Sequence, residues 1–339
     1  MEQSGDVLSE FGPAAAAAID KAPDPLLSGP KRQHYLPRFY LEGFIRDGLL
    51  AVYDRETNEV RRQAPVNTGV IGHFYTVEDT EGRKRFEVEA IFSQVEDRAA
   101  PIIKKLAAKE GITAEQRGDL AAFITLGMFR TPDLLESIKS MHAEVVKRMT
   151  KATFGSVERA KESLRKRPDN AGLSEEELER EAQAMFEFVQ GDKWRAEIEH
   201  RWALGMALKM WGVIAPILAG RNWRVMHRDS DKRSFITTDA PLILTTTERR
   251  ENNFWGIGFA NADALVFFPL CESCVLAIFG QDGTTDHIAI DQTWTRQINL
   301  VVADRCKQYL VGRDEELVHS LAKFLGLHKK QWQPKMRVS

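Results

Sequence analysis

Cysteine is scarce in this sequence, and segments that target or anchor a chain are missing. The three cysteines, Cys271, Cys274 and Cys306, are too few for the disulfide framework of a small secreted domain. No charged start leads into a short apolar stretch, which predicts no signal peptide. No run of about 18 uncharged apolar residues occurs, which argues against a membrane span. We therefore expect a cytoplasmic protein with no membrane partner.

An excess of charge of one sign is also lacking. The chain carries 47 Lys and Arg residues against 49 Asp and Glu residues, a net charge of −2. No global field therefore attracts nucleic acid or an anionic membrane, although a local basic patch is compatible with this balance.

Several motifs of large enzyme classes are absent. The sequence has no P-loop, no G-x-G-x-x-G, no H-E-x-x-H and no G-x-S-x-G, which disfavours the corresponding chemistries. The "CESC" stretch of Cys271 and Cys274 lies in strand-like sequence with no C-x-x-H nearby. That context favours neither a structural zinc site nor a thioredoxin-type motif.

Composition divides the chain into segments. Residues 1–30 are rich in Ala, Pro and Gly, which predicts a disordered leader. We expect one domain over residues 31–335, with a helical insertion at about 86–220. Within it, residues 155–200 are dense in both charge signs, which indicates an exposed helical arm and a candidate surface for a homo-oligomer.

Strand patterns flank this helical block. A hairpin pattern surrounds the polar turn 55–58, and short runs rich in Val, Ile, Phe and Thr follow Asn222. We therefore predict an α+β fold. Its mixed, largely antiparallel sheet would be formed by N- and C-terminal strands, with the long helical block inserted between them.

Polar and proline residues predict where helices begin and end. Capping boxes begin at Thr113 and Ser174, and Asp291 is expected to cap a helix near the C-terminus. Pro101 and Pro216 are expected to kink or end their helices. The helix after Asp291 is expected to bury Trp294, Ile298, Val301 and Val302.

Arg130 is the most informative single residue, because it shares a helix face with Leu120 and Phe123. A buried cation needs an anionic partner. That partner could be Glu96, as an internal ion pair, or a phosphate of a ligand. Glu89 and Glu96 share one helix face, where two carboxylates could hold a divalent cation, act as acid and base, or simply be solvated.

Three more polar residues precede or follow predicted elements. His34, beside Tyr35, comes just before a helix expected to start at Pro37. The helix dipole there favours a neutral imidazole, which can accept a proton or bind a metal, or can be held within aromatic packing. Asp239 ends a strand, where it could face a cleft or form a turn. Asn67 is expected in a turn.

The opening stretch "QHYLPRFYLEGF", residues 33–44, resembles the H-Y-x-P-x-F-Y-L-x-x-F hallmark of a large, mainly bacterial family of unknown function. Further segments follow that family's order up to residue 312, and they read "VYDRETNEVRR", "PVNTGVIGHFYT", "VEDRAAPIIKKL", "RTP", "FITTDAP" and "FFPL". The family's T-S-D-x-P reads T-T-D-A-P here. The resemblance implies a shared fold and no particular activity. It places the following residues on motif positions: His34, Tyr35, Pro37, Asn67, Glu96, Arg130, Asp239 and Pro241.

Three hypotheses for function follow. In a metal-dependent phosphodiester hydrolase, such as a nuclease of bacterial defence, Glu96 and Asp239 would hold a divalent cation. His34 would act as base or ligand, and Arg130 would steady a phosphate. Alternatively, a non-catalytic regulatory module would bind a nucleotide or a protein through Arg130. A nucleic acid or a nucleotide is a candidate partner of the protein. In the third hypothesis all four residues are structural.

Overall fold

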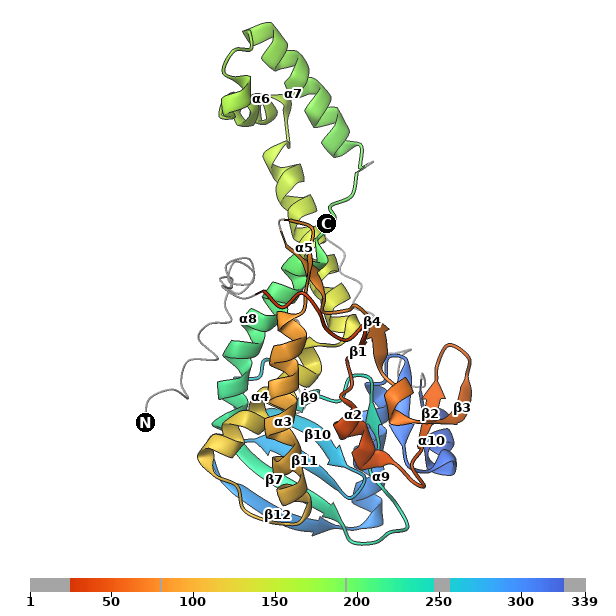
Figure 1. The fold of residues 1–339 in the computed structure, drawn as a ribbon. Coiled ribbons are helices and arrows are strands. Elements are labelled where there is room, and N and C mark those ends of the chain that lie inside the picture. Colours follow the sequence, from red (N-terminus) through yellow and green to blue (C-terminus); the bar gives the residue numbers. More distant parts are fainter. Residues whose placement is uncertain (1–24, 80, 193, 247–256, 326–339) are drawn as a thin grey trace. The chain divides into compact units, whose positions relative to one another are not determined.

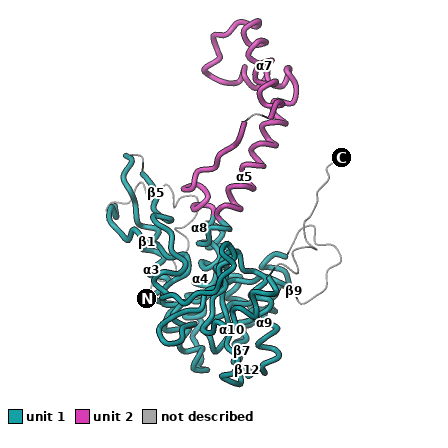
Figure 2. Tube along the Cα trace, turned by 90° about the vertical axis from the view of Figure 1, so that its right-hand side faces the viewer, with its two compact units in different colours: residues 1–134, 207–339 teal, residues 135–206 magenta. Residues whose placement is uncertain are grey.

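A computed structural model describes residues 25–79, 81–192, 194–246 and 257–325. Most of the predicted leader, residues 1–24, lies outside the described residues. Leu26 is described, and its backbone N–H donates to Glu87 Oε1 at 3.0 Å. The chain divides into two compact units, residues 1–134 with 207–339 and residues 135–206 (Figure 2).

The largest sheet of the first unit has five strands (Figure 1). Their order is β12 (Thr285–Ile290), β7 (Asn222–Arg228), β11 (Cys274–Phe279), β10 (Ala264–Cys271) and β9 (Ile243–Thr246). β12 is parallel to β7 and the other pairs are antiparallel. Strand patterns predicted β7, β10 and β11, whereas β12 was missed because its polar residues mask the alternation.

A second sheet combines strands from the N-terminal and the C-terminal parts of the first unit. Its order is β3 (Glu59–Gln63), β2 (Leu50–Asp54), β13 (Tyr309–Gly312) and β8 (Thr237–Thr238), antiparallel throughout. The predicted hairpin is confirmed, and Asn58 in its turn has φ 59°. The predicted α+β class is confirmed as well, with the strands divided between two main sheets rather than one.

Short elements form the remainder of residues 32–85, including the opening motif. They are β1 (Arg32–His34) paired with β4 (Val70–Gly72), β5 (Val77–Glu78) paired with β6 (Lys84–Arg85), α2 (Arg38–Leu41), η1 (Glu42–Phe44) and η2 (Pro65–Asn67). Pro37 is the N-cap of α2. This single α-helical turn is followed directly by the 3-10 turn η1. Tyr40 and Phe44, four residues apart in these turns, are both buried.

Helices lie on both faces of the five-stranded sheet. α3 (Glu87–Ala107) and α4 (Ala114–Phe129) cross one face (Figure 1), where the rings of Phe123 and Phe268 lie 6.0 Å apart. α9 (Gln292–Asp304) and α10 (Glu315–Ala322) share the other hydrophobic core with residues of both sheets. Successive side chains of β10 point to opposite faces of the sheet, so this strand contributes to the hydrophobic cores on both faces.

The helix boundaries test the predictions made from capping residues and from prolines. Both capping boxes are confirmed, and Asp291 accepts from Trp294 N–H at 2.8 Å. Pro101 does not end its helix, because α3 continues through it to Ala107. α8 (His200–Ala219) likewise continues through Pro216. A proline removes only one backbone hydrogen-bond donor, and the hydrogen bonds of the neighbouring turns keep each helix continuous.

The buried face of α9 was predicted only in part. Ile298 and Val302 are buried, whereas Trp294 is 64% exposed and Val301 is 39% exposed. The prediction for these two was wrong because the helix turns only a narrow stripe toward the sheets.

α8 is the one helix in the described part of the chain that is long and apolar enough to cross a membrane by length and composition. Leu208, Trp211 and Leu218 of this helix are buried. The Trp211 indole N–H donates to the Ala122 carbonyl of α4 at 2.8 Å. One face of α8 is thus packed within the first unit, whereas Val213 of the same helix is 61% exposed.

The second unit is helical. It comprises most of α5 (Pro132–Thr153), then α6 (Val157–Arg165), η3 (Pro168–Asn170) and α7 (Glu175–Gln190). Its own small core is formed by Phe154, Ala160, Leu164, Leu178, Ala182 and Val189. Most of the charged segment 155–200 falls in this unit, where Lys161 pairs with Glu179 at 2.6 Å.

Candidate functional site

Arg130 lies buried at the C-cap of α4, with 1% of its surface exposed. Its Nη1 donates to Glu96 Oε1 at 2.5 Å, and its Nη2 donates to the backbone carbonyl of His34. The guanidinium also lies 5.0 Å from the Phe92 ring centroid and 5.6 Å from that of Tyr75, within cation–π range. Because α4 ends here, Arg130 ties α4, α3 and β1 together.

Glu89 completes what we call the buried arginine cluster: His34, Tyr75, Glu89, Glu96 and Arg130. Burial raises the pKa of Glu89 to about 7, opposed by the charge of Arg130 and reinforced by Glu96. Its Oε2 is buried and has no hydrogen-bond partner among the described residues. A carboxyl group that titrates near neutrality can both donate and accept a proton.

The ring of His34 is also set up as a proton acceptor. Burial lowers its pKa, a hydrogen bond with the Val66 backbone opposes that shift, and the positive charge of Arg130 lowers the pKa further. The ring Nε2 is buried without a partner in the part of the chain that the structure describes. The imidazole is therefore neutral at pH 7.

The loop beside His34 is held by Asn67. Arg32 of β1 donates to Asn67 Oδ1 at 3.0 Å and to the Val66 carbonyl at 3.2 Å. Tyr35 follows His34, is buried, and its backbone N–H donates to Gly69 O at 2.8 Å.

Asp239 lies just after β8 and is 7% exposed. Its Oδ1 accepts from Lys307 N–H at 2.9 Å, and its Oδ2 accepts from Gln308 N–H at 2.6 Å. Burial raises the pKa of this carboxyl, and the hydrogen bonds from the backbone oppose the shift. Asp239 thus joins β8 to the turn that precedes β13.

The four proposed catalytic residues therefore fall into two groups. Arg130 contacts the Glu96 carboxylate and the His34 backbone carbonyl, whereas no hydrogen bond or ion pair among the described residues joins Asp239 to them. Burial, and then the charge of Asp239, raises the pKa of the Tyr35 phenol, which places Asp239 near the residue that follows His34. The two proposed metal ligands, Glu96 and Asp239, each have other partners. Within the described ranges no three His, Cys, Asp or Glu side chains form a group that could hold a metal ion.

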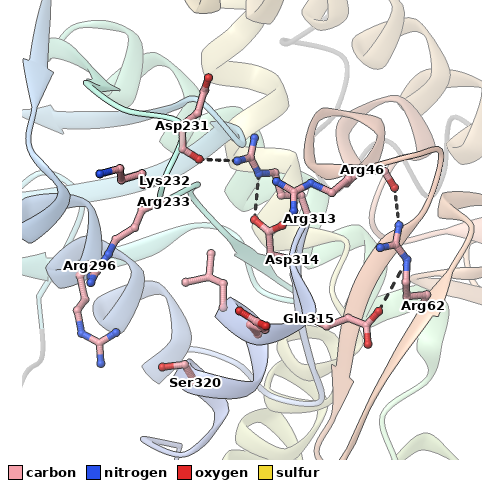
Figure 3. A pocket seen from close by; sticks show the side chains of 12 residues that line it. Arg46, Arg62, Asp231, Lys232, Arg233, Arg296, Arg313, Asp314, Glu315 and Ser320 are labelled. Atoms are coloured by element: carbon pink, nitrogen blue, oxygen red, sulfur yellow. Dashed lines mark hydrogen bonds and ion pairs between the residues drawn. The ribbon is translucent and has the colours of Figure 1, made fainter.

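A larger feature is a pocket of about 820 Å³, which we call the arginine pocket (Figure 3). Six cationic side chains and four acidic ones line it, together with Leu317 and Ser320. The charged residues are Arg46, Arg62, Lys232, Arg233, Arg296, Arg313, Asp231, Asp314, Glu315 and Glu316. This is a local excess of positive charge on a chain whose net charge is −2.

Half of these cations have acidic partners. Arg46 pairs with Asp314, Arg313 pairs with Asp314 at 3.0 Å, and Arg62 lies 3.9 Å from Glu315. Figure 3 shows Arg46 and Arg62 on one side of the start of α10.

Lys232, Arg233 and Arg296 lie on the other side of the arginine pocket (Figure 3). None of the three forms an ion pair with another described residue. The Arg296 guanidinium lies over the Phe324 ring, 5.5 Å from its centroid. Sequence reasoning missed this pocket because its residues come from separate segments, and the adjacent pair Lys232–Arg233 was its one local signal.

The fold and these sites define an α+β protein with the buried arginine cluster and the arginine pocket. A family model described as "Protein of unknown function (DUF4238)" matches residues 32–316. The match spans most of the chain, which therefore belongs to this family, as the opening motif had indicated for a family of unknown function. Searches of curated proteins and of solved structures found no match.

Proposed function

We propose that this protein binds a phosphorylated small molecule, of which a nucleotide is the best-fitting class, in the arginine pocket. The observation that carries this proposal is the set of three cations, Lys232, Arg233 and Arg296, that form no ion pair with a described acidic side chain. Guanidinium groups bind phosphate through paired hydrogen bonds and remain charged at all physiological pH values.

The shape of the pocket supports a small ligand. Its volume of about 820 Å³ lies within the range of about 300–1,000 Å³ of small-molecule sites. Leu317 adds an apolar surface at the start of α10. A long nucleic acid would need a wider basic surface than the net charge of −2 favours. The cysteines form no disulfide among the described residues, which favours a reducing compartment, the cytoplasm, as the location.

A thermal-shift panel of nucleotides and pyrophosphate tests this proposal. A ligand at about 100 times its Kd should stabilise the wild type by about 2.7 kcal/mol. The double variant Lys232→Ser, Arg233→Ser should lose most of that stabilisation. Arg148→Ser is the matched control, because Arg148 is exposed on α5 and pairs with Glu144. Silence across the panel, or equal shifts in the double variant, would contradict the proposal.

Phosphodiester hydrolysis at the buried arginine cluster is a second candidate, including a nuclease role in bacterial defence. It is favoured by one observation, the two unpartnered buried atoms His34 Nε2 and Glu89 Oε2. In this version Glu89 would donate a proton to the leaving oxygen, and His34 would take one from water. The geometry favours this acid–base version over one in which Glu96 and Asp239 hold a divalent cation.

A nuclease screen with and without a chelator separates these versions. Acid–base hydrolysis predicts activity that survives chelation and falls at least tenfold in Glu89→Gln and in His34→Ala. A divalent-cation mechanism predicts loss on chelation and loss in Asp239→Ala. Full activity in both His34→Ala and Glu89→Gln would exclude catalysis by the cluster.

A further inference from the structure

Cys271 and Cys274 face each other across the tight turn that joins β10 and β11. They are direct partners in the antiparallel register, and their sulfur atoms lie 3.6 Å apart. A disulfide needs about 2.05 Å, so a small rotation of the side chains would bring the sulfurs within bonding distance. The helical C-x-x-C expected of a thioredoxin-type site is absent, but the hairpin turn achieves the same juxtaposition of two thiols.

The turn between the two cysteines is held firmly. The Glu272 backbone N–H donates to Gly43 O at 2.8 Å. The Glu272 carboxylate pairs with Arg228 and with Arg313, each at 2.9 Å. These anchors hold Glu272, which lies between the two cysteines, so that little ordering entropy remains to be lost when the thiols react.

The two thiols differ in access. Cys274 is fully buried, whereas Cys271 is partly exposed and lines a pocket of about 240 Å³ beside Phe39 and Lys104. Gly43 keeps this pocket open next to Cys271, because a Cβ there would lie 3.1 Å from Cys271 Cβ. One thiol is therefore placed to react with a ligand, and the other to resolve the product.

We infer that Cys271 and Cys274 form a thiol–disulfide exchange site for small disulfides that carry carboxylate groups, with Cys271 as the attacking thiol. The exposed ammonium of Lys104 in the same pocket matches the carboxylates, and Phe39 provides an apolar wall.

The reaction balances with the small disulfide RSSR as the oxidant. The Cys271 thiolate attacks one sulfur of RSSR, which forms a mixed disulfide and breaks the S–S bond, so that RS⁻ leaves with the electron pair. RS⁻ takes the proton of the Cys274 thiol. The Cys274 sulfur then attacks the Cys271 sulfur and releases the second RS⁻, which is protonated by water. The dithiol is oxidised by two electrons, and RSSR is reduced to two RSH.

The acidity of the two thiols fits these roles. The pKa of Cys271 is lowered to about 6, first by the hydrogen bond from the Cys274 thiol and, against the effect of burial, also by Ser273. The pKa of Cys274 is raised, by the same contact with Cys271 and then by burial. Cys271 is thus the thiolate at neutral pH, and nucleophilic attack requires the thiolate.

Incubation of the full chain with oxidised glutathione, followed by alkylation and peptide mapping, tests the inference. The wild type should form a Cys271–Cys274 disulfide and leave Cys306 alkylated after unfolding. Cys274→Ser should accumulate a glutathione mixed disulfide on Cys271, and Cys271→Ser should form neither product. Cys306→Ser is the control and should behave as the wild type does.

Lys104→Ala tests the class of substrate. It should slow the reaction with oxidised glutathione by up to about fivefold, the effect of one exposed charge contact, and should leave the reaction with neutral 2-hydroxyethyl disulfide unchanged. The inference is overturned if the wild type keeps both thiols after incubation, or if folded Cys274→Ser, judged by circular dichroism, carries no glutathione. Equal slowing with both disulfides would exclude the role of Lys104.

Discussion

Single buried charges organise the N-terminal part of the first unit. Arg130 is buried and depends on Glu96 and on the His34 carbonyl for its hydrogen bonds. Its Nη1 and Nη2 have partners, whereas its buried Nε has none among the described residues. The two bonds make it a strut between α3, α4 and β1. A ligand phosphate would have to displace Glu96 to reach Arg130. The phosphate-binding role that the sequence suggested for Arg130 is therefore better suited to the cations of the arginine pocket.

Glu89 should make stability depend on pH. Its folded-state pKa of about 7 exceeds the ordinary value of about 4.3, so between these values the folded state holds more protons than the unfolded state. Its contribution therefore falls as pH rises from about 4 to 7. Glu89→Gln should be more stable than the wild type by roughly 1–2 kcal/mol at pH 8, after allowance for residual exposure, and equal to it at pH 4.

Urea titrations at pH 4, 6 and 8 would measure this difference, with Glu96→Gln as the matched control. That variant removes the partner of buried Arg130 and should lose about 2–3 kcal/mol at pH 7. A Glu89→Gln variant that is less stable than the wild type at pH 8 would contradict the raised pKa.

Asp239 should contribute to the free energy of unfolding through its two backbone hydrogen bonds. Asp239→Ala leaves the backbone N–H groups of Lys307 and Gln308 without their acceptor, and each lost buried hydrogen bond costs about 1–3 kcal/mol. We expect a loss of about 2–4 kcal/mol in free energy of unfolding, measured by urea denaturation. Asp304→Ala, at an exposed helix end, should change stability by less than about 0.5 kcal/mol, and an equal loss in both variants would contradict the assigned role.

Elements were predictable from sequence where the signal is local. The hairpin of β2 and β3 and the starts of α4 and α7 follow from turn and cap chemistry that acts within four residues. The continuation of α3 through Pro101 depends on packing further along the chain, which local rules do not contain. The contact of Arg130 with Glu96 was predictable because a buried charge demands a partner. The arginine pocket was not, since its cations meet only in the folded chain.

The capping box of α4 provides a test at this scale. The Thr113 hydroxyl accepts from Gln116 N–H at 3.2 Å. Thr113→Ala should therefore cost about 1 kcal/mol, whereas Thr113→Ser should cost almost nothing because it keeps the acceptor. The measurement is the urea midpoint at constant slope. Equal losses in the two variants would show that the hydroxyl does not cap the helix.

At the scale of the whole molecule, the two units have separate hydrophobic cores. The small core of the second unit should open at lower free energy than that of the first. Leu178→Ala should raise hydrogen exchange in peptides from residues 157–190 and leave peptides from β10 and β11 unchanged. Faster exchange in both sets of peptides would contradict separate cores.

The arginine pocket combines residues from widely separated segments of the first unit into one basic surface, and its binding of a phosphorylated ligand is the central claim. The most direct test is isothermal titration calorimetry with pyrophosphate at several salt concentrations, comparing the wild type with Lys232→Ser, Arg233→Ser. We predict binding by the wild type that weakens as salt rises, and binding at least tenfold weaker, with a shallower salt dependence, in the double variant. No heat of binding to the wild type at low salt, or equal affinity in both proteins, would contradict the account.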